Sequence, residues 1–341
     1  MPSDSIAAAT PRFSLMRATA SRVAAIVGGP RVGFILKFGV SAGLIALVCR
    51  NIDGAVLAER LSSQSAGWLA ATVLLGFVQI TLLSLRWQMI LRALGAKSGI
   101  VSALAVTFMG CFFGAFLFGP TGSDVARAVL APPRTLGRQG IVHSVLFERL
   151  ASTIGLGLAA APLVAVSAAA LAHGLLLLIA LAMVPLPFVA LVAIAWLARR
   201  FGDRPGTVFQ ALRELDQSRR RLTRVWPRFA LAVAIAALGQ LLVAVEVWCL
   251  AQSQHLGVPL VDFAVMMPPI MLLVALPISA GGWGVREGAI VAGLALVGVE
   301  STSALLLSVE FGLIATAVSL PGGAIWLYRC FSRGNPPNSV A

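Results

Sequence analysis

Two glycine-rich segments with charged residues interrupt the hydrophobic runs of this chain. The first, residues 119–127, contains Pro120, Gly122, Asp124 and Arg127. The second, residues 277–288, contains Pro277, Gly281, Gly282, Gly284, Arg286 and Glu287. Glycines let backbone N–H groups converge, and arginine presents a planar fork of donors. The pattern in both segments therefore indicates recognition of an anion such as a phosphate group.

Further ionisable residues lie inside or at the ends of hydrophobic runs. An ionisable group at mid-bilayer costs at least about 2.5–3.5 kcal/mol, so it implies a partner or a water-filled path. Local pairing is one reading, with Glu148 bound to Arg127 or Arg86 and Glu310 bound to Arg286; Glu246 is open to the same reading. The other reading is contact with a substrate, for which the candidates are Arg86, Asp124, Arg127, Glu148, Arg149, Arg286, Glu287 and Glu310.

Sequence motifs for catalysis are not found in this chain. It has no phosphate-loop lysine, no Gly-x-Ser-x-Gly elbow and no pair of histidines at metal-ligand spacing. We therefore expect no catalytic residue, no metal and no cofactor. Asp124 with His143 is the only loose candidate for an acid–base pair.

Composition places the chain in a membrane. It has 341 residues, of which 59% are hydrophobic and 11% charged, and its mean hydropathy is +0.93. Soluble domains carry about 25% charged residues. The net charge of +13 is concentrated in residues 199–228, where the arginines indicate a cytoplasmic loop that contacts anionic inner-leaflet lipids. No aromatic platform accompanies these arginines, which argues against nucleic-acid binding.

Hydrophobic runs predict the helices that must position the charged segments. A run needs about 20 residues to cross the bilayer as a helix. Candidate runs fall at 33–50, 67–85, 100–118, 141–170, 174–198, 229–251, 263–299 and 303–328. The basic residues 1–32 precede the first run and predict a cytoplasmic N-terminal tail.

Loop charges constrain how these runs thread the membrane. If 100–118 crosses fully, the arginine-rich loop 199–228 falls outside, against the positive-inside rule. The conflict disappears if 100–128 enters from the cytoplasm and returns there, and if 263–299 enters and leaves on the outer side. We therefore predict an all-α protein with six full spans and two re-entrant helical hairpins. Its parts are a tail 1–32, a half 33–170, a half 171–330 and a cytoplasmic tail 331–341.

Matching residues suggest that the two halves form an inverted-topology repeat. The segment from Gln79 to Trp87 parallels that from Gln240 to Trp248 at an offset of 161 residues. Leu94-Gly95 likewise parallels Leu256-Gly257, and the Glu148 and Glu310 spans correspond. Between the halves, residues 202–226 show apolar positions at helical spacing, which predicts an amphipathic helix on the inner leaflet. A plain solvated linker is the alternative.

Four of these stretches carry a family resemblance. They are residues 86–95, residues 120–127, Glu148-Arg149-Leu150 and residues 276–288. Together they resemble the flippase-like transmembrane domain of lysylphosphatidylglycerol synthases, over nearly the whole chain after residue 33. The family pattern has Gly-Gly-Asp in the first segment, whereas this chain has Gly122-Ser123-Asp124. The family's soluble aminoacyl-transferring domain is not expected here, so the resemblance does not imply synthesis of a lysyl-lipid.

The resemblance implies lipid movement between leaflets of a bacterial cytoplasmic membrane. The leading hypothesis is a transporter for an amphipathic lipid with a phosphate-bearing or glycosylated headgroup. A non-catalytic subunit of a lipid-biosynthetic complex is an alternative, with residues 202–226 docking the partner enzyme. A membrane-embedded lipid-modifying enzyme is a third reading.

Overall fold

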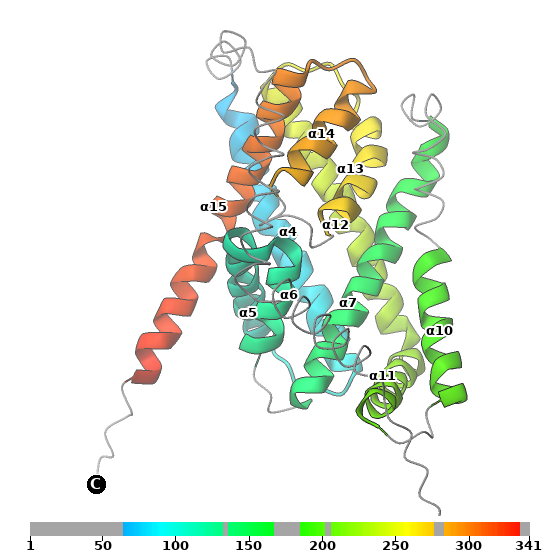
Figure 1. The fold of residues 1–341 in the computed structure, drawn as a ribbon. Coiled ribbons are helices and arrows are strands. Elements are labelled where there is room, and N and C mark those ends of the chain that lie inside the picture. Colours follow the sequence, from blue (N-terminus) through cyan, green and yellow to red (C-terminus); the bar gives the residue numbers. More distant parts are fainter. Residues whose placement is uncertain (1–63, 132–135, 167–184, 202–205, 276–282, 335–341) are drawn as a thin grey trace, which may run out of the picture.

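The computed structural model describes residues 64–131, 136–166, 185–201, 206–275 and 283–334 (Figure 1). These residues form helices and no strand, which confirms the expectation of an all-α membrane protein. The predicted span 33–50 and the motif residues Pro277, Gly281 and Gly282 lie outside the described residues.

Four of the described helices are long and apolar enough to cross a membrane. They are α4 (Ala66–Ala93), α7 (Gly137–Ala160), α12 (Trp226–Ser253) and α15 (Ser301–Gly334). A 28-residue helix such as α4 rises about 42 Å at 1.5 Å per residue, which exceeds the roughly 30 Å of hydrocarbon. Helix α10 (Pro185–Phe201) covers the second part of the predicted span 174–198.

The first predicted hairpin consists of two short helices that pack against each other. Helix α5 (Ile100–Phe113) continues through a π-helical turn (Gly114–Phe118) into α6 (Gly119–Leu130). Gly119, with φ of +61°, reverses the chain. Gly114 permits the close approach, because a Cβ there would lie 2.8 Å from the carbonyl oxygen of Gly119. From the sequence, Pro120 and Gly122 were the residues expected to form the turn, but both lie within α6, one and three residues beyond the reversal.

A second pair of short helices occupies the other end of the molecule. Helix α13 (Leu260–Val274) runs inward and α14 (Val285–Ala295) returns, whereas α5 and α6 enter from the opposite end (Figure 1). Helix α14 starts after Gly284, whose φ is +87°.

The helix ends that lead into the two pairs are built alike. After α4, Gly95 N–H donates to Arg92 O and Ala96 N–H to Leu91 O. After α12, the same two bonds run from His255 to Gln252 and from Leu256 to Ala251. Both are Schellman caps, with φ of +104° at Gly95 and +57° at His255. His255 therefore corresponds to Gly95 at a spacing of 160 residues, so the sequence match of Leu94-Gly95 with Leu256-Gly257 is wrong by two positions.

Small residues let the long helices approach one another. A Cβ on Gly155 of α7 would lie 2.6 Å from the Cβ of Ala236 in α12. Gly239 of α12 similarly faces the side chain of Gln79 in α4. Close packing through small residues is typical of membrane helices, where apolar surface alone gives no net attraction in lipid.

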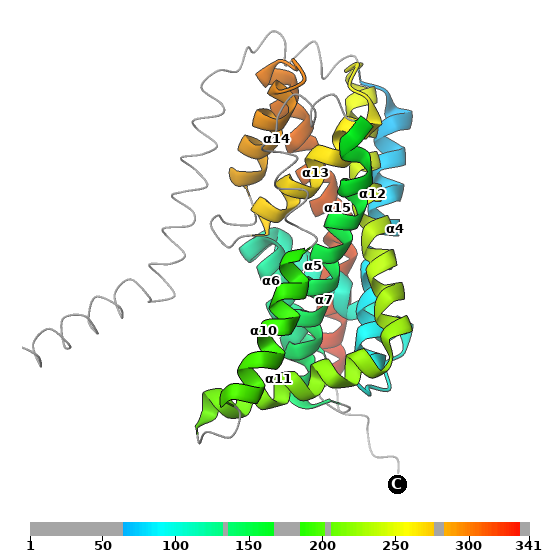
Figure 2. The same ribbon diagram turned by 90° about the vertical axis from the view of Figure 1, so that its right-hand side faces the viewer.

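Helix α11 (Thr207–Arg224) lies across the end of the molecule, as Figure 2 shows. A helix is therefore present over residues 207–224 of the segment 202–226, where the apolar spacing predicted one. His143 Nδ1 of α7 lies 2.9 Å from Ser218 Oγ, and Leu222 is buried in a cluster with Ile90 and Phe147. These contacts dock α11 onto the membrane helices.

Candidate functional site

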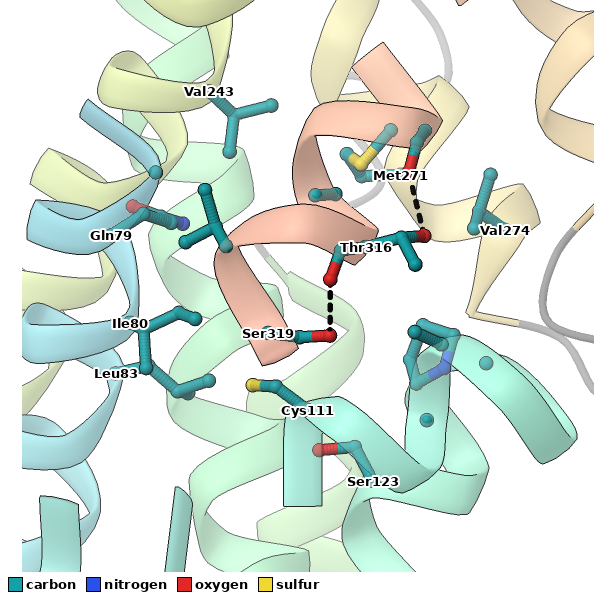
Figure 3. Close-up of a pocket in the computed structure, with 18 of the residues that line it drawn as sticks. Gln79, Ile80, Leu83, Cys111, Ser123, Val243, Met271, Val274, Thr316 and Ser319 are labelled. Atoms are coloured by element: carbon teal, nitrogen blue, oxygen red, sulfur yellow. Dashed lines mark hydrogen bonds between the residues drawn. The ribbon is translucent and has the colours of Figure 1, made fainter. Parts of the chain in front are cut away.

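A cavity of about 350 Å³ lies between the two short-helix pairs. Its wall includes Ser123 of α6, Cys111 of α5, Met271 and Val274 of α13, and Thr316 and Ser319 of α15 (Figure 3). Helix α4 contributes Gln79, Ile80 and Leu83. The cavity thus receives residues from both halves of the chain.

Charged residues from the first motif meet beside this cavity. Glu148 of α7 accepts a hydrogen bond from Arg86 of α4 on Oε1, and its Oε2 lies 3.0 Å from Arg127 Nη2 of α6. The Glu148 and Arg127 side chains are only 2% and 3% exposed. Both pairings that the sequence suggested for Glu148 therefore occur together, and one carboxylate holds three helices in place.

Asp124 extends this network toward the cavity mouth. Its carboxylate accepts from Arg127 on Oδ1 and from Arg149 Nε on Oδ2. The resulting chain runs Arg86–Glu148–Arg127–Asp124–Arg149, with three cations and two anions. The network therefore carries one positive charge that its own carboxylates leave unbalanced.

Helix packing sets the position of the Arg127 guanidinium. Its Cζ lies 5.4 Å from the ring centroid of Trp87, a distance at which a cation is attracted to the aromatic face. Trp87 is itself held by a 3.1 Å hydrogen bond from Nε1 to Ser144 Oγ. Gly110 provides room, because a Cβ there would lie 2.7 Å from Arg127 Cγ.

The second motif holds its arginine differently. Arg286 Nε lies 3.0 Å from Glu287 Oε1, and Glu287 Oε2 accepts a 2.5 Å hydrogen bond from the Gly284 N–H. The Arg286 guanidinium carbon lies 4.5 Å from the Trp283 ring centroid. A Cβ at Gly312 of α15 would overlap this guanidinium, so a larger residue there would force the end of the Arg286 side chain to move. Arg286 lines the same cavity as Arg127.

The predicted pairing of Glu310 with Arg286 is wrong. Glu310 accepts hydrogen bonds from Gln64 and from Gln254 Nε2, the latter at 2.8 Å. It lies two residues from Gly312, and a helix turns by about 100° per residue, so it points to a different neighbour. Six of the candidate substrate-contacting residues line the cavity, namely Arg86, Asp124, Arg127, Glu148, Arg149 and Arg286. The other two candidates, Glu287 and Glu310, do not line it.

The remaining candidates from the sequence are the turn residues and the possible acid–base pair. Of the turn residues, Pro120 lines the cavity at the start of α6, and Gly284 caps α14. His143 does not meet Asp124, since His143 contacts Ser218 and Asp124 binds two arginines. The loose acid–base pair of the enzyme reading is therefore not assembled.

Sequence reasoning missed several residues of the cavity wall. Glu246 of α12 was recognised as a membrane charge but not as part of the site, and it lines the cavity. Gln79 was noted only as a repeat match. Gly312 carried no signal at all, because its role depends on which helix face meets Arg286. Trp283 stood inside the motif, and aromatic rings beside arginines are a recognisable cation-binding pattern.

Comparison with known proteins identifies the family of this chain. The family model described as "Lysylphosphatidylglycerol synthase TM region" matches residues 34–323. No curated protein matches the chain at a significant level. The matched range contains every described residue that lines the cavity, and it ties the chain to membrane lipid metabolism. The protein therefore belongs to the lysylphosphatidylglycerol synthase transmembrane-region family.

Proposed function

We propose that this protein moves a lipid with an anionic, phosphate-bearing headgroup between the two leaflets. The observation that carries the proposal is the charge on the cavity wall. Among the described residues, four arginines and three carboxylates line it, namely Arg86, Arg127, Arg149, Arg286, Asp124, Glu148 and Glu246. Arg286 is balanced by its ion pair with Glu287, so the unbalanced positive charge belongs to the network in which three arginines share Glu148 and Asp124. An excess of buried positive charge is costly unless an anion balances it.

Donor geometry favours phosphate as the anion. The Nε and Nη1 atoms of Arg127 and the Nε of Arg86 are buried and have no hydrogen-bond partner within the described part of the chain. Buried donors are rarely left unpaired in proteins. Arginine binds phosphate through two parallel N–H donors, so a phosphate oxygen that enters the cavity would satisfy these groups.

The arrangement of helices supports alternating access. We infer that α4–α7 and α12–α15 are inverted halves, with the α5–α6 and α13–α14 pairs as re-entrant hairpins from opposite sides. Such halves place substrate sites near mid-membrane at the repeat interface. The cavity receives both hairpins, so rocking one half against the other would open it to each leaflet in turn. Only the polar headgroup needs to pass through the cavity, because the apolar tails can remain in the hydrocarbon of the bilayer.

The basic helix supports one orientation in the membrane. The arginines Arg213, Arg219, Arg220, Arg221 and Arg224 lie on α11, and by the positive-inside rule we infer that this end of the molecule faces the cytoplasm and contacts anionic lipid. The complete topology would then have six full spans with both termini cytoplasmic, in a bacterial inner membrane. We also infer that the protein moves the lipid without altering it chemically.

Reconstitution into vesicles tests the proposal. A phospholipid with a fluorescent label on its anionic headgroup is placed in both leaflets, and a membrane-impermeant quencher is added outside. Wild-type protein should expose the inner-leaflet label to the quencher, and Arg286→Ala should slow this by at least about tenfold, since a charge-assisted contact contributes roughly 1.5–3 kcal/mol. Arg329→Ala, at the end of α15 away from the cavity, is the matched control. Equal rates for Arg286→Ala and wild type would remove the binding role of Arg286.

A further inference from the structure

Glu246 is the carboxylate on the cavity wall without an ion pair among the described residues. It lies on α12, seven residues before the helix ends at Ser253, and is 5% exposed. Its Oε1 atom is buried and has no hydrogen-bond partner in the part of the chain that the structure describes. An ionised carboxylate in such surroundings costs far more free energy than a neutral one.

A comparison with Glu148 shows that this isolation is specific. Glu148 is similarly buried and lines the same cavity, but it binds two guanidinium groups, from Arg86 and Arg127. Those arginines, together with Arg149, are already committed to Glu148 and Asp124. The protein thus holds one cavity carboxylate as a permanent anion and leaves another where its charge is unbalanced.

The other titratable groups around the cavity differ from Glu246. Helices α4, α5, α6, α7 and α14 contribute Arg86, Cys111, Asp124, Arg127, Glu148, Arg149 and Arg286. Helices α13 and α15 contribute side chains without a titratable group, among them Met271, Val274, Thr316 and Ser319 (Figure 3). Cys249 lies three residues after Glu246 on α12. Within this described set, Glu246 is the carboxylate whose charge state can change without breaking an ion pair.

We infer that Glu246 binds a proton that is taken up together with the anionic headgroup, so that lipid movement is coupled to proton movement. The inference rests on the proposed function. A proton from water adds to a carboxylate oxygen, which changes the side-chain charge from −1 to 0. It returns to water on the other side of the membrane when the headgroup leaves. No other bond forms or breaks.

Charge balance on the cavity wall gives the direction of coupling. The four arginines on the wall are faced by Asp124, Glu148 and the Glu287 that pairs with Arg286, so a protonated Glu246 leaves one net positive charge. An ionised Glu246 would bring the same set to neutrality. An anion binds more tightly to the more positive wall. Thermodynamic linkage then requires anion binding to promote proton uptake by the same factor, which for coupled sites is typically about 5- to 150-fold.

Infrared spectroscopy of the purified full-length protein tests the protonation state without any lipid transfer. The carbonyl band of a protonated carboxylic acid should gain intensity in wild type as the pH is lowered from mildly alkaline to mildly acidic, and Glu246→Gln should gain less. Glu300→Gln, which removes an exposed carboxylate outside the cavity, should gain as much as wild type over the same pH range. An identical pH dependence in wild type and Glu246→Gln would show that Glu246 binds no proton in this range and would overturn the inference, whatever the protein transports.

A binding titration tests the coupling. Short-chain phosphatidylglycerol, whose phosphodiester keeps its charge, is added to the protein in weakly buffered detergent with a pH indicator. Wild type should take up protons and bind about tenfold more tightly at mildly acidic than at mildly alkaline pH. Glu246→Gln should bind at every pH with the acidic-pH affinity of wild type and take up no proton.

Three results would contradict the coupling, and each has a different meaning. Binding by wild type without proton uptake would overturn this inference and leave the proposed function standing. Proton release with phosphatidylethanolamine, and no uptake with phosphatidylglycerol, would make Glu246 an ammonium site instead. No binding of either lipid would overturn the proposed function and the coupling together.

Discussion

Arg127 and Glu148 form a 3.0 Å ion pair that joins the second helix of one hairpin to a long helix beside the cavity. Arg127 lies on α6 and Glu148 on α7, and both side chains are almost fully buried. Glu148 also binds Arg86 of α4. The position of the α5–α6 pair therefore depends on a charge cluster in a low-dielectric environment, where losing one partner is far more costly than at a surface.

Replacing Glu148 with Gln should destabilise the protein strongly. The change leaves Arg86 and Arg127 without their shared carboxylate, and breaking a buried pair costs about 3–5 kcal/mol. Thermal unfolding in detergent measures the effect as a lower melting temperature. Glu300→Gln, which removes an exposed carboxylate, serves as the control and should unfold as wild type does. Equal melting temperatures for both variants would mean that the buried cluster contributes nothing to stability.

Gly312→Ala should displace the Arg286 guanidinium. The added methyl group would overlap the guanidinium, and overpacking of this kind costs about 1–3 kcal/mol. Lipid transfer should fall together with the melting temperature. Gly288→Ala is the matched control on α14, because no atom lies within 4 Å of the position that its added methyl group would occupy, and alanine is favoured over glycine in a helix by up to about 1 kcal/mol. Wild-type activity and stability in Gly312→Ala would contradict the close approach of the Arg286 guanidinium to Gly312.

Asp216 on α11 should make a pH-dependent contribution to stability. Burial raises the pKa of Asp216, but hydrogen bonds from Arg220 and Arg219 outweigh it and hold the pKa below its usual value. A lowered folded-state pKa adds stability that is fully present above the unfolded value of about 3.9 and is lost as pH falls through the folded value. Because Arg220 is 57% exposed, we expect at most about 1 kcal/mol.

Thermal unfolding of Asp216→Asn at a series of pH values tests the direction of this pH dependence. The stability difference from wild type should be constant near neutral pH and shrink at acidic pH. Glu214→Gln on the same helix, where Gln210 is the hydrogen-bond partner, is the control. A difference that grows as pH falls would contradict the assigned shift.

Much of the architecture was readable from the sequence. The hydrophobic runs located α4, α7, α12 and α15, because a chain in lipid must satisfy its backbone polar groups within helices. Loop charges indicated that 100–128 turns back, and α5 and α6 do pack together as a pair. The number of full spans and the inverted relation of the halves stay predictions.

Side-chain partners were harder to predict than helices. The match of Trp87 with Trp248 has an offset of 161 residues, whereas the helix caps correspond at 160. One residue rotates a side chain by about 100°, so Trp87 lies beside Arg127 while Trp248 packs edge-to-face on Trp68. The same limit explains Glu310, whose glutamine partners could not be read from composition or spacing.

The turn of the first hairpin shows a second limit. Proline and glycine marked residues 119–122, but Gly119, Pro120 and Gly122 could each have supplied the reversal. The positive φ falls on Gly119, and the π-helical turn before it has no sequence signature of its own. Gly122 is instead buried within α6.

Occupation of the cavity by an anionic headgroup is the central claim, and protection of Cys111 tests it most directly. Cys111 lines the cavity, so Cys49, Cys249 and Cys330 are replaced by Ser and the labelling rate of the remaining thiol is measured. Short-chain phosphatidylglycerol should slow labelling by about tenfold at saturation, while diacylglycerol of the same chain length should have little effect. Equal labelling with and without phosphatidylglycerol, or equal protection by diacylglycerol, would contradict headgroup binding between the hairpins.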